Sequence, residues 1–197
     1  MPSFYGWPIG VRFELSGEQA EHEEAIERAH TRAEAIFQTT FAQTDEVWVL
    51  ASKPYHLVPT FWRRWVREPS SVLALRRLGS AFAPDDWAHR HEARVSSVTD
   101  DYRSTWSELS VRTSPDRVDH SRLLHVTAGY ERGLGDRDWW DTHFVDPARG
   151  IVFYMYDDRG LDVMATSPDA IRHVLEAHAD WVLEYDRDRI EATFGKF

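Results

Sequence analysis

The sequence predicts an α+β fold in which one mainly antiparallel sheet of about six strands is covered by helices. Several short segments alternate apolar and polar residues with the period of a strand. Two longer segments carry apolar residues with the period of a helix. A tight turn joins the last two strand-like segments, as in an antiparallel hairpin.

The N-terminal part predicts a strand, a helix and a second strand. Residues 9–15 alternate as a half-buried strand does. A helix is expected over residues 16–40, because one apolar stripe at helical spacing is formed by Ile26, Ala29, Ala33, Ile36, Phe37 and Phe41. Residues 47–51 form a short apolar run that is typical of a buried strand. The connection is long enough for a parallel crossover. Short helical pieces are expected next, around residues 60–65, 71–77 and 84–91.

The C-terminal part predicts strands over residues 106–113 and 122–128, then a long loop over residues 129–149. A hairpin follows, with strands over residues 151–156 and 161–166. Its turn suits a type I geometry with Gly160 in the left-handed region. Pro168 occupies the first position of a further helix, and Asp186 is expected to cap a final short helix.

Length and composition predict one domain, residues 1–197. The chain has 42% hydrophobic residues and no cysteine, and a single core serves chains of up to roughly 250 residues. The lack of cysteine excludes a disulfide scaffold, a thiolate metal site and a cysteine nucleophile. No signal peptide and no long apolar run is visible. We therefore expect a cytoplasmic protein without a membrane partner.

The formal net charge of −10 is unevenly distributed. Residues 18–46 carry a net −6, residues 53–94 a net +4 and residues 156–197 a net −5. An overall negative field repels phosphate, which makes a nucleic-acid partner a weak expectation. The same field would suit a basic protein partner, although acidity also serves solubility alone.

Residues 156–162, Tyr-Asp-Asp-Arg-Gly-Leu-Asp, resemble the C-terminal signature of a bacterial family described as domain of unknown function 3885. The continuation is similar as well, with a hairpin, a helix, and then Trp181, Tyr185, Asp186 and Arg187. The resemblance covers roughly residues 150–194, with the hairpin and helices over residues 153–194. The resemblance implies a shared fold, and because the family has no established activity, it implies nothing about the chemistry of this protein.

The turn at Asp157, Asp158 and Arg159 is the sharpest local feature of the sequence. As an exposed tip it is a candidate binding site. Turn chemistry alone also explains each residue, since Asp bonds the backbone ahead and Arg can pair with an acid. Both interpretations stay open.

Trp139 and Trp140 form a second candidate binding site. Neighbouring side chains of an extended segment point to opposite sides, so we expect one tryptophan to be exposed or to cap a pocket. The surrounding loop is longer than a plain connection requires, which favours a functional role.

No motif predicts a catalytic residue, a cofactor or a metal site. The chain has no Gly-x-Ser-x-Gly elbow, no phosphate-binding loop and no dinucleotide loop. The ten histidines include no pair with convincing ligand spacing.

Three functions remain as hypotheses. The first is a non-catalytic acidic module that binds another protein, as an immunity protein or a regulatory partner does. The second is a hydrolase whose site would combine Asp157, Asp158, His125 and His143. The third is nucleic-acid binding through residues 55–67, where aromatic and basic residues interleave.

Overall fold

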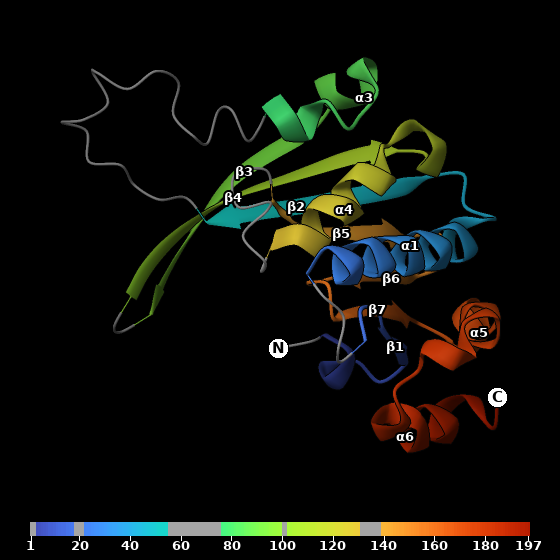
Figure 1. The fold of residues 1–197 in the computed structure, drawn as a ribbon. Coiled ribbons are helices and arrows are strands. Elements are labelled where there is room, and N and C mark those ends of the chain that lie inside the picture. The colour runs from blue at the N-terminus through green and yellow to red at the C-terminus, as the bar shows by residue number, and fades with distance from the viewer. Residues whose placement is uncertain (1–2, 18–21, 55–75, 100–101, 131–138) are drawn as a thin grey trace, which may run out of the picture.

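The protein is built on one seven-stranded sheet. The computed structural model describes residues 3–17, 22–54, 76–99, 102–130 and 139–197 (Figure 1). The strand order is β1-β7-β6-β5-β2-β4-β3, and every neighbouring pair is antiparallel. The strands are β1 (Gly10–Glu14), β2 (Val47–Pro54), β3 (His91–Thr99), β4 (Tyr102–Thr113), β5 (Asp141–Asp146), β6 (Ile151–Met155) and β7 (Gly160–Ala165). This confirms the α+β class, with seven strands in place of about six.

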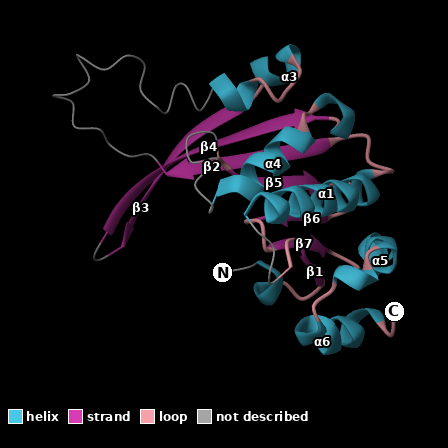
Figure 2. Cartoon of the chain, in the orientation of Figure 1, coloured by secondary structure: helices cyan, strands magenta, loops and turns pink. Residues whose placement is uncertain are grey.

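The helices form a second layer over one face of the sheet. Figures 1 and 2 show α1, α4 and α5 in front of the sheet, with α3 and α6 at opposite ends. Their bounds are α1 (His22–Phe41), α3 (Pro84–Ala88), α4 (His120–Tyr130), α5 (Pro168–Ala177) and α6 (Glu184–Phe194). A short 3-10 helix, η1 (Ser3–Gly6), packs against β1 and β7. None of the described helices combines the length and the apolarity that a bilayer crossing demands.

The core lies between α1 and the sheet. The predicted apolar stripe of α1 is buried, and alternate residues of β2, β5 and β6 are buried on the same side of the sheet. Phe37 lies at the centre, with ring centroids 4.7 Å from Phe41, 5.0 Å from Phe144 and 5.4 Å from Phe153. Aromatic pairs at these distances and tilted angles stabilise a core beyond the area that they bury.

The opening strand–helix–strand unit is a wide crossover. The antiparallel order from β1 through β7, β6 and β5 to β2 gives β1 and β2 the same direction. They are not paired, because three strands of the C-terminal half lie between them. The predicted crossover is thus confirmed in direction, and α1 spans the inserted strands.

The strand predicted over residues 122–128 is wrong, because this segment lies in α4. Leu124, Thr127 and Ala128 are buried at helical spacing. Asp119 precedes the helix and accepts the backbone N–H of Arg122 at 3.0 Å, which is typical of an N-cap. The run of apolar and β-branched residues favoured a strand on propensity alone.

The long loop predicted over residues 129–149 is also wrong in part, since it contains β5. Thr142, Phe144 and Asp146 point into the core, and two of these three are polar. Asp146 is buried because it accepts the hydroxyl of Thr44 at 2.6 Å and the N–H of Arg149 at 2.9 Å. The buried polar side chains hid the apolar alternation of the strand.

The elements around residues 55–99 were only partly predicted. The helical piece around residues 60–65 lies outside the described residues. The described end of the next piece, residues 76–79, is helical. The helix expected over residues 84–91 ends at Ala88, and β3 begins at His91.

Two local expectations are corrected at the C-terminus. Gly160 does not have a positive φ, which among the described glycines occurs at Gly17, Gly150 and Gly195. Asp186 does not cap α6, which begins at Glu184. Its buried carboxylate instead accepts the hydroxyl of Tyr5 at 3.0 Å.

Candidate functional site

The sheet has a second face, opposite α1, that carries two cross-strand rows of side chains; we call it the open face. The first row is apolar and joins Trp48 of β2, Val145 of β5 and Val152 of β6, in register. The second row runs parallel to the first and joins Leu50, His143, Tyr154, Asp162 and Arg12. Directly opposed side chains in neighbouring strands are in contact range, so each row acts as a unit.

Trp48 and Leu50 are exposed apolar residues of the open face, and the charged Glu108 and Arg112 of β4 are exposed on the same face. Their exposed fractions are 39% and 40%, although β2 is an interior strand with β5 and β4 as neighbours. The indole N–H of Trp48 donates to Glu46 at 3.2 Å, and Glu46 also pairs with Arg112. Two large apolar side chains in the interior of the sheet therefore face solvent.

His143 and Tyr154 form a flat aromatic pair beside Leu50. Their rings stack with centroids 3.9 Å apart and planes within 4°. Burial lowers the pKa of His143, and the charge of Asp141 opposes this shift. Burial also raises the pKa of Tyr154, and Asp141 adds to it as a charge and as a hydrogen-bond partner. Both groups therefore favour their neutral forms.

The β1–β7 end of the open face is covered by the N-terminal segment. The carboxylate of Asp162 is fully buried and accepts the backbone N–H of Phe4 at 2.8 Å. Arg12 donates to the Tyr5 hydroxyl at 2.8 Å, and Tyr5 in turn donates to Asp186. Buried polar groups need such partners, so this end is structural.

Asp157, Asp158 and Arg159 lie in the β6–β7 turn, as expected. Asp157 is 2% exposed and accepts the N–H of Arg159 at 2.7 Å and its Nε at 2.9 Å. The carbonyl of Arg159 accepts the N–H of Leu15 at 3.0 Å, which ties the turn to the end of β1. Asp158 is also buried. Arg159 is therefore the exposed member of this candidate site.

Trp139 and Trp140 point in different ways. Trp140 is buried, whereas Trp139 is half-buried and stacks on Tyr130 with ring centroids 4.0 Å apart. The carbonyl of Trp139 accepts Nζ of Lys53 at 2.9 Å. Through this stack, Trp139 contacts the end of α4 directly before β5 begins.

The four groups of the hydrolase hypothesis do not come together. His143 lies on the open face, where its ring stacks on Tyr154. The negative charge of Asp157 is near enough to Tyr154 to contribute to its raised pKa. His125 lies in α4, in the helical layer on the other side of the sheet. The carboxylate of Asp157 is also engaged by the guanidinium of Arg159. The aromatic and basic residues proposed for nucleic-acid binding, 55–67, lie outside the described residues.

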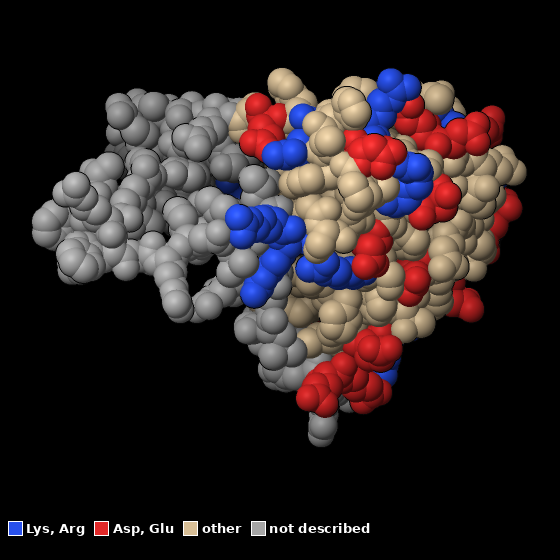
Figure 3. Space-filling view, turned by 90° about the horizontal axis from the view of Figure 1, so that it is seen from above, with Lys and Arg blue, Asp and Glu red and all other residues tan. Residues whose placement is uncertain are grey.

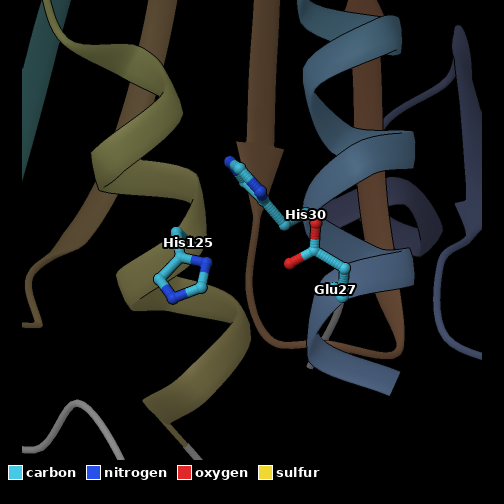
Figure 4. A group of neighbouring side chains, drawn as sticks. All are labelled: Glu27, His30 and His125. Carbon is cyan, nitrogen blue, oxygen red and sulfur yellow. The ribbon is translucent and has the colours of Figure 1, made fainter. Parts of the chain in front are cut away.

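The helical layer carries the side chains that could share a metal ion. Within the described ranges, this group consists of Glu27, His30 and His125, whose ligand atoms lie within 4.8 Å of one another (Figure 4). Beside it, α1 and Trp181 line a shallow groove that carries both acidic and basic side chains. Its lining residues are Glu23, Glu24, Glu27, Arg28, Thr31, Arg32 and Trp181.

Sequence reasoning missed the exposed residues of β2. Residues 47–51 are all apolar, a pattern that predicts a buried strand. Val47, Val49 and Ala51 are indeed buried, and Trp48 and Leu50 point to the open face. No signal in the strand itself separates a covered second face from an uncovered one.

Comparison with known proteins places the chain in a family without an assigned activity. Residues 1–186 match the model of a family described as "Domain of unknown function (DUF3885)". The chain is also similar to the uncharacterized protein YnaE of Bacillus subtilis (strain 168), with 44% identity over 48 residues. That match covers 24% of this chain and 22% of YnaE. No solved structure matches the chain.

Proposed function

The chain belongs to the DUF3885 family, whose description names no activity, and we propose that it is a non-catalytic module. In this proposal it binds another protein through the open face. The observation that carries the proposal is the exposure of Trp48 and Leu50 at the centre of the sheet. Large apolar side chains grouped on a surface mark interaction sites in soluble proteins.

The chemistry of the open face supports a protein partner. Trp48 and Leu50 would supply the apolar centre of an interface, with Val145 and Val152 beside them in register. The stacked pair of His143 and Tyr154 adds a flat, neutral surface with hydrogen-bonding groups. Tryptophan and tyrosine are enriched among the residues that dominate binding energy, and such residues cluster near interface centres.

The net charge of −10 supports a basic partner. Figure 3 views the molecule from above and shows acidic side chains in several groups on that face, with basic side chains between some of them. A negative field attracts a basic protein at long range and raises the rate of association. In its concrete form, the proposal is that this chain acts in the cytoplasm as an immunity protein or as a regulatory partner of the protein that it binds.

The residues predicted from the sequence extend the proposed surface. The side chain of Arg159 is 66% exposed at the turn that joins β6 to β7, two strands of the open face. Asp157, which accepts the backbone N–H of Arg159, supports the shape of this turn, and Asp158 is buried next to it in the chain. Trp139 and Trp140 support the start of β5, which carries His143.

The proposal is tested by comparing proteins captured from the native lysate by three baits. The baits are the wild-type chain, the double variant Trp48→Ser/Leu50→Ser, and the control Tyr185→Ser. Tyr185 is 85% exposed and lies on α6, away from β2. We expect a discrete partner with the wild type and the control, and at least about 30-fold weaker binding with the double variant.

Circular dichroism and a thermal melt verify that the double variant folds. A partner that all three baits recover equally would contradict the proposal, as would recovery of no partner above background. Purified wild type and double variant are then compared for affinity toward the recovered partner.

A further inference from the structure

We propose that Glu27, His30 and His125 form a binding site for a divalent transition-metal ion that links α1 to α4. The site lies in the helical layer, on the side of the sheet opposite the open face, so it is independent of the proposed protein interface. Glu27 and His30 are three residues apart on α1 and therefore share one side of that helix. His125 faces them from α4, which packs along α1 (Figure 4).

The hydrogen bonds of His30 prepare one ring nitrogen as a ligand. Its Nε2 lies 3.0 Å from the carbonyl oxygen of Ser121 and 3.0 Å from the Ser121 hydroxyl. A carbonyl oxygen can only accept, so Nε2 carries the proton and donates. Nδ1 then holds a free lone pair. Metal-bound histidines are oriented in this way, with the second ring nitrogen donating to a carbonyl or a carboxylate.

The geometry allows the three side chains to close around an ion. Their ligand atoms lie within 4.8 Å of one another. A tetrahedral zinc ion with bonds of about 2.1 Å holds its ligand atoms about 3.4 Å apart. Glu27 and His125 are exposed, so small rotations of these two side chains close the remaining distance. The largely buried His30 provides the fixed member.

The donor set selects the class of metal. Two imidazoles and one carboxylate match the His and Glu ligands of zinc sites that keep a fourth position for water. Magnesium and calcium prefer oxygen ligands, so they should bind weakly here.

The test is a titration of the metal-free, full-length protein with zinc chloride, in competition with a chromogenic chelator. We expect one equivalent of Zn²⁺ to bind to the wild type. The variants His125→Ala and Glu27→Ala should each bind at least about tenfold more weakly. Both replaced side chains are exposed, so both variants should fold.

The matched control is His173→Ala, which removes an exposed histidine from α5. It should bind zinc as the wild type does, and magnesium should not compete in any protein. A second readout is the melting temperature, which zinc should raise in the wild type and control alone. Absence of zinc binding at 100-fold molar excess, or equal affinity of wild type and His125→Ala, would overturn the proposal.

Discussion

Tyr156 and Gly160 show how one residue identity is fixed by a close contact. A β-carbon at Gly160 would lie 1.8 Å from the hydroxyl of Tyr156 and 2.5 Å from its Cζ. The φ angle of Gly160 is not positive, so the constraint is steric. The sequence pointed to glycine here for its backbone freedom, and the structure gives a different reason for the same residue.

Gly160→Ala should therefore destabilise the protein by about 1–3 kcal/mol, because the tyrosine ring must move. The control Gly6→Ala adds a methyl group with nothing within 4 Å and should change the unfolding free energy by less than about 0.5 kcal/mol. Urea unfolding measures both. In a Tyr156→Ala background the cost of Gly160→Ala should shrink; an unchanged cost would show that the ring is not its cause.

His143 should make stability depend on pH. Burial lowers its pKa in the folded protein, whereas in the unfolded chain the pKa stays at about 6.5. As pH falls through and below that value, the unfolded chain takes up a proton that the folded protein does not, so the unfolding free energy decreases. His178, whose pKa burial also lowers, contributes in the same direction.

The variant His143→Phe keeps a ring beside Tyr154 and removes the titrating group. Its unfolding free energy should fall less between pH 7.5 and pH 5.5 than that of the wild type. Part of the slope should remain because His178 is retained. An identical pH slope in the two proteins would contradict the assignment.

At the scale of elements, α4 and β5 show what local sequence patterns cannot decide. Residues 122–128 suit a strand by propensity, yet they form a helix that buries Leu124, Thr127 and Ala128 at helical spacing. The cap at Asp119 was a readable signal that outweighs propensity. In β5, the buried Asp146 accepts a hydrogen bond from Thr44, a tertiary neighbour that the segment alone does not reveal, whereas the buried Thr142 donates locally to the carbonyl of Trp140.

The misassigned helix also hid the candidate metal group. On a strand, His125 could not be related to a helix that carries Glu27 and His30. The structure brings the three together because α1 and α4 pack side by side. The periodic elements α1 and β6 were predicted well, since their apolar pattern matches their burial, and β7 was predicted although it is buried along its whole length.

Asp119→Ala should destabilise α4 by about 1 kcal/mol, because the N–H of Arg122 loses its acceptor. The comparison variant is Asp188→Ala, at an exposed position within α6, and it should stay within about 0.5 kcal/mol of the wild type. Chemical denaturation measures both. Equal effects of the two variants would argue that Asp119 does not cap the helix.

At the scale of the whole molecule, the fold is two layers deep and leaves part of the sheet uncovered. The α+β class followed from periodicity, which local sequence encodes. The order of the strands did not, because the C-terminal strands insert between β1 and β2 only when the chain folds. The open face could not be predicted from the sequence either, because it depends on which face of the sheet the helices cover in the folded protein.

The most direct test of the account is site-specific photo-crosslinking from position 50 in cells that make the protein natively. The control position is Tyr185, which is exposed on α6. We predict a discrete adduct with a second, basic protein from position 50 and none from position 185. No adduct from position 50, the same adduct from both positions, or an adduct whose mass is twice that of this chain would contradict the central claim.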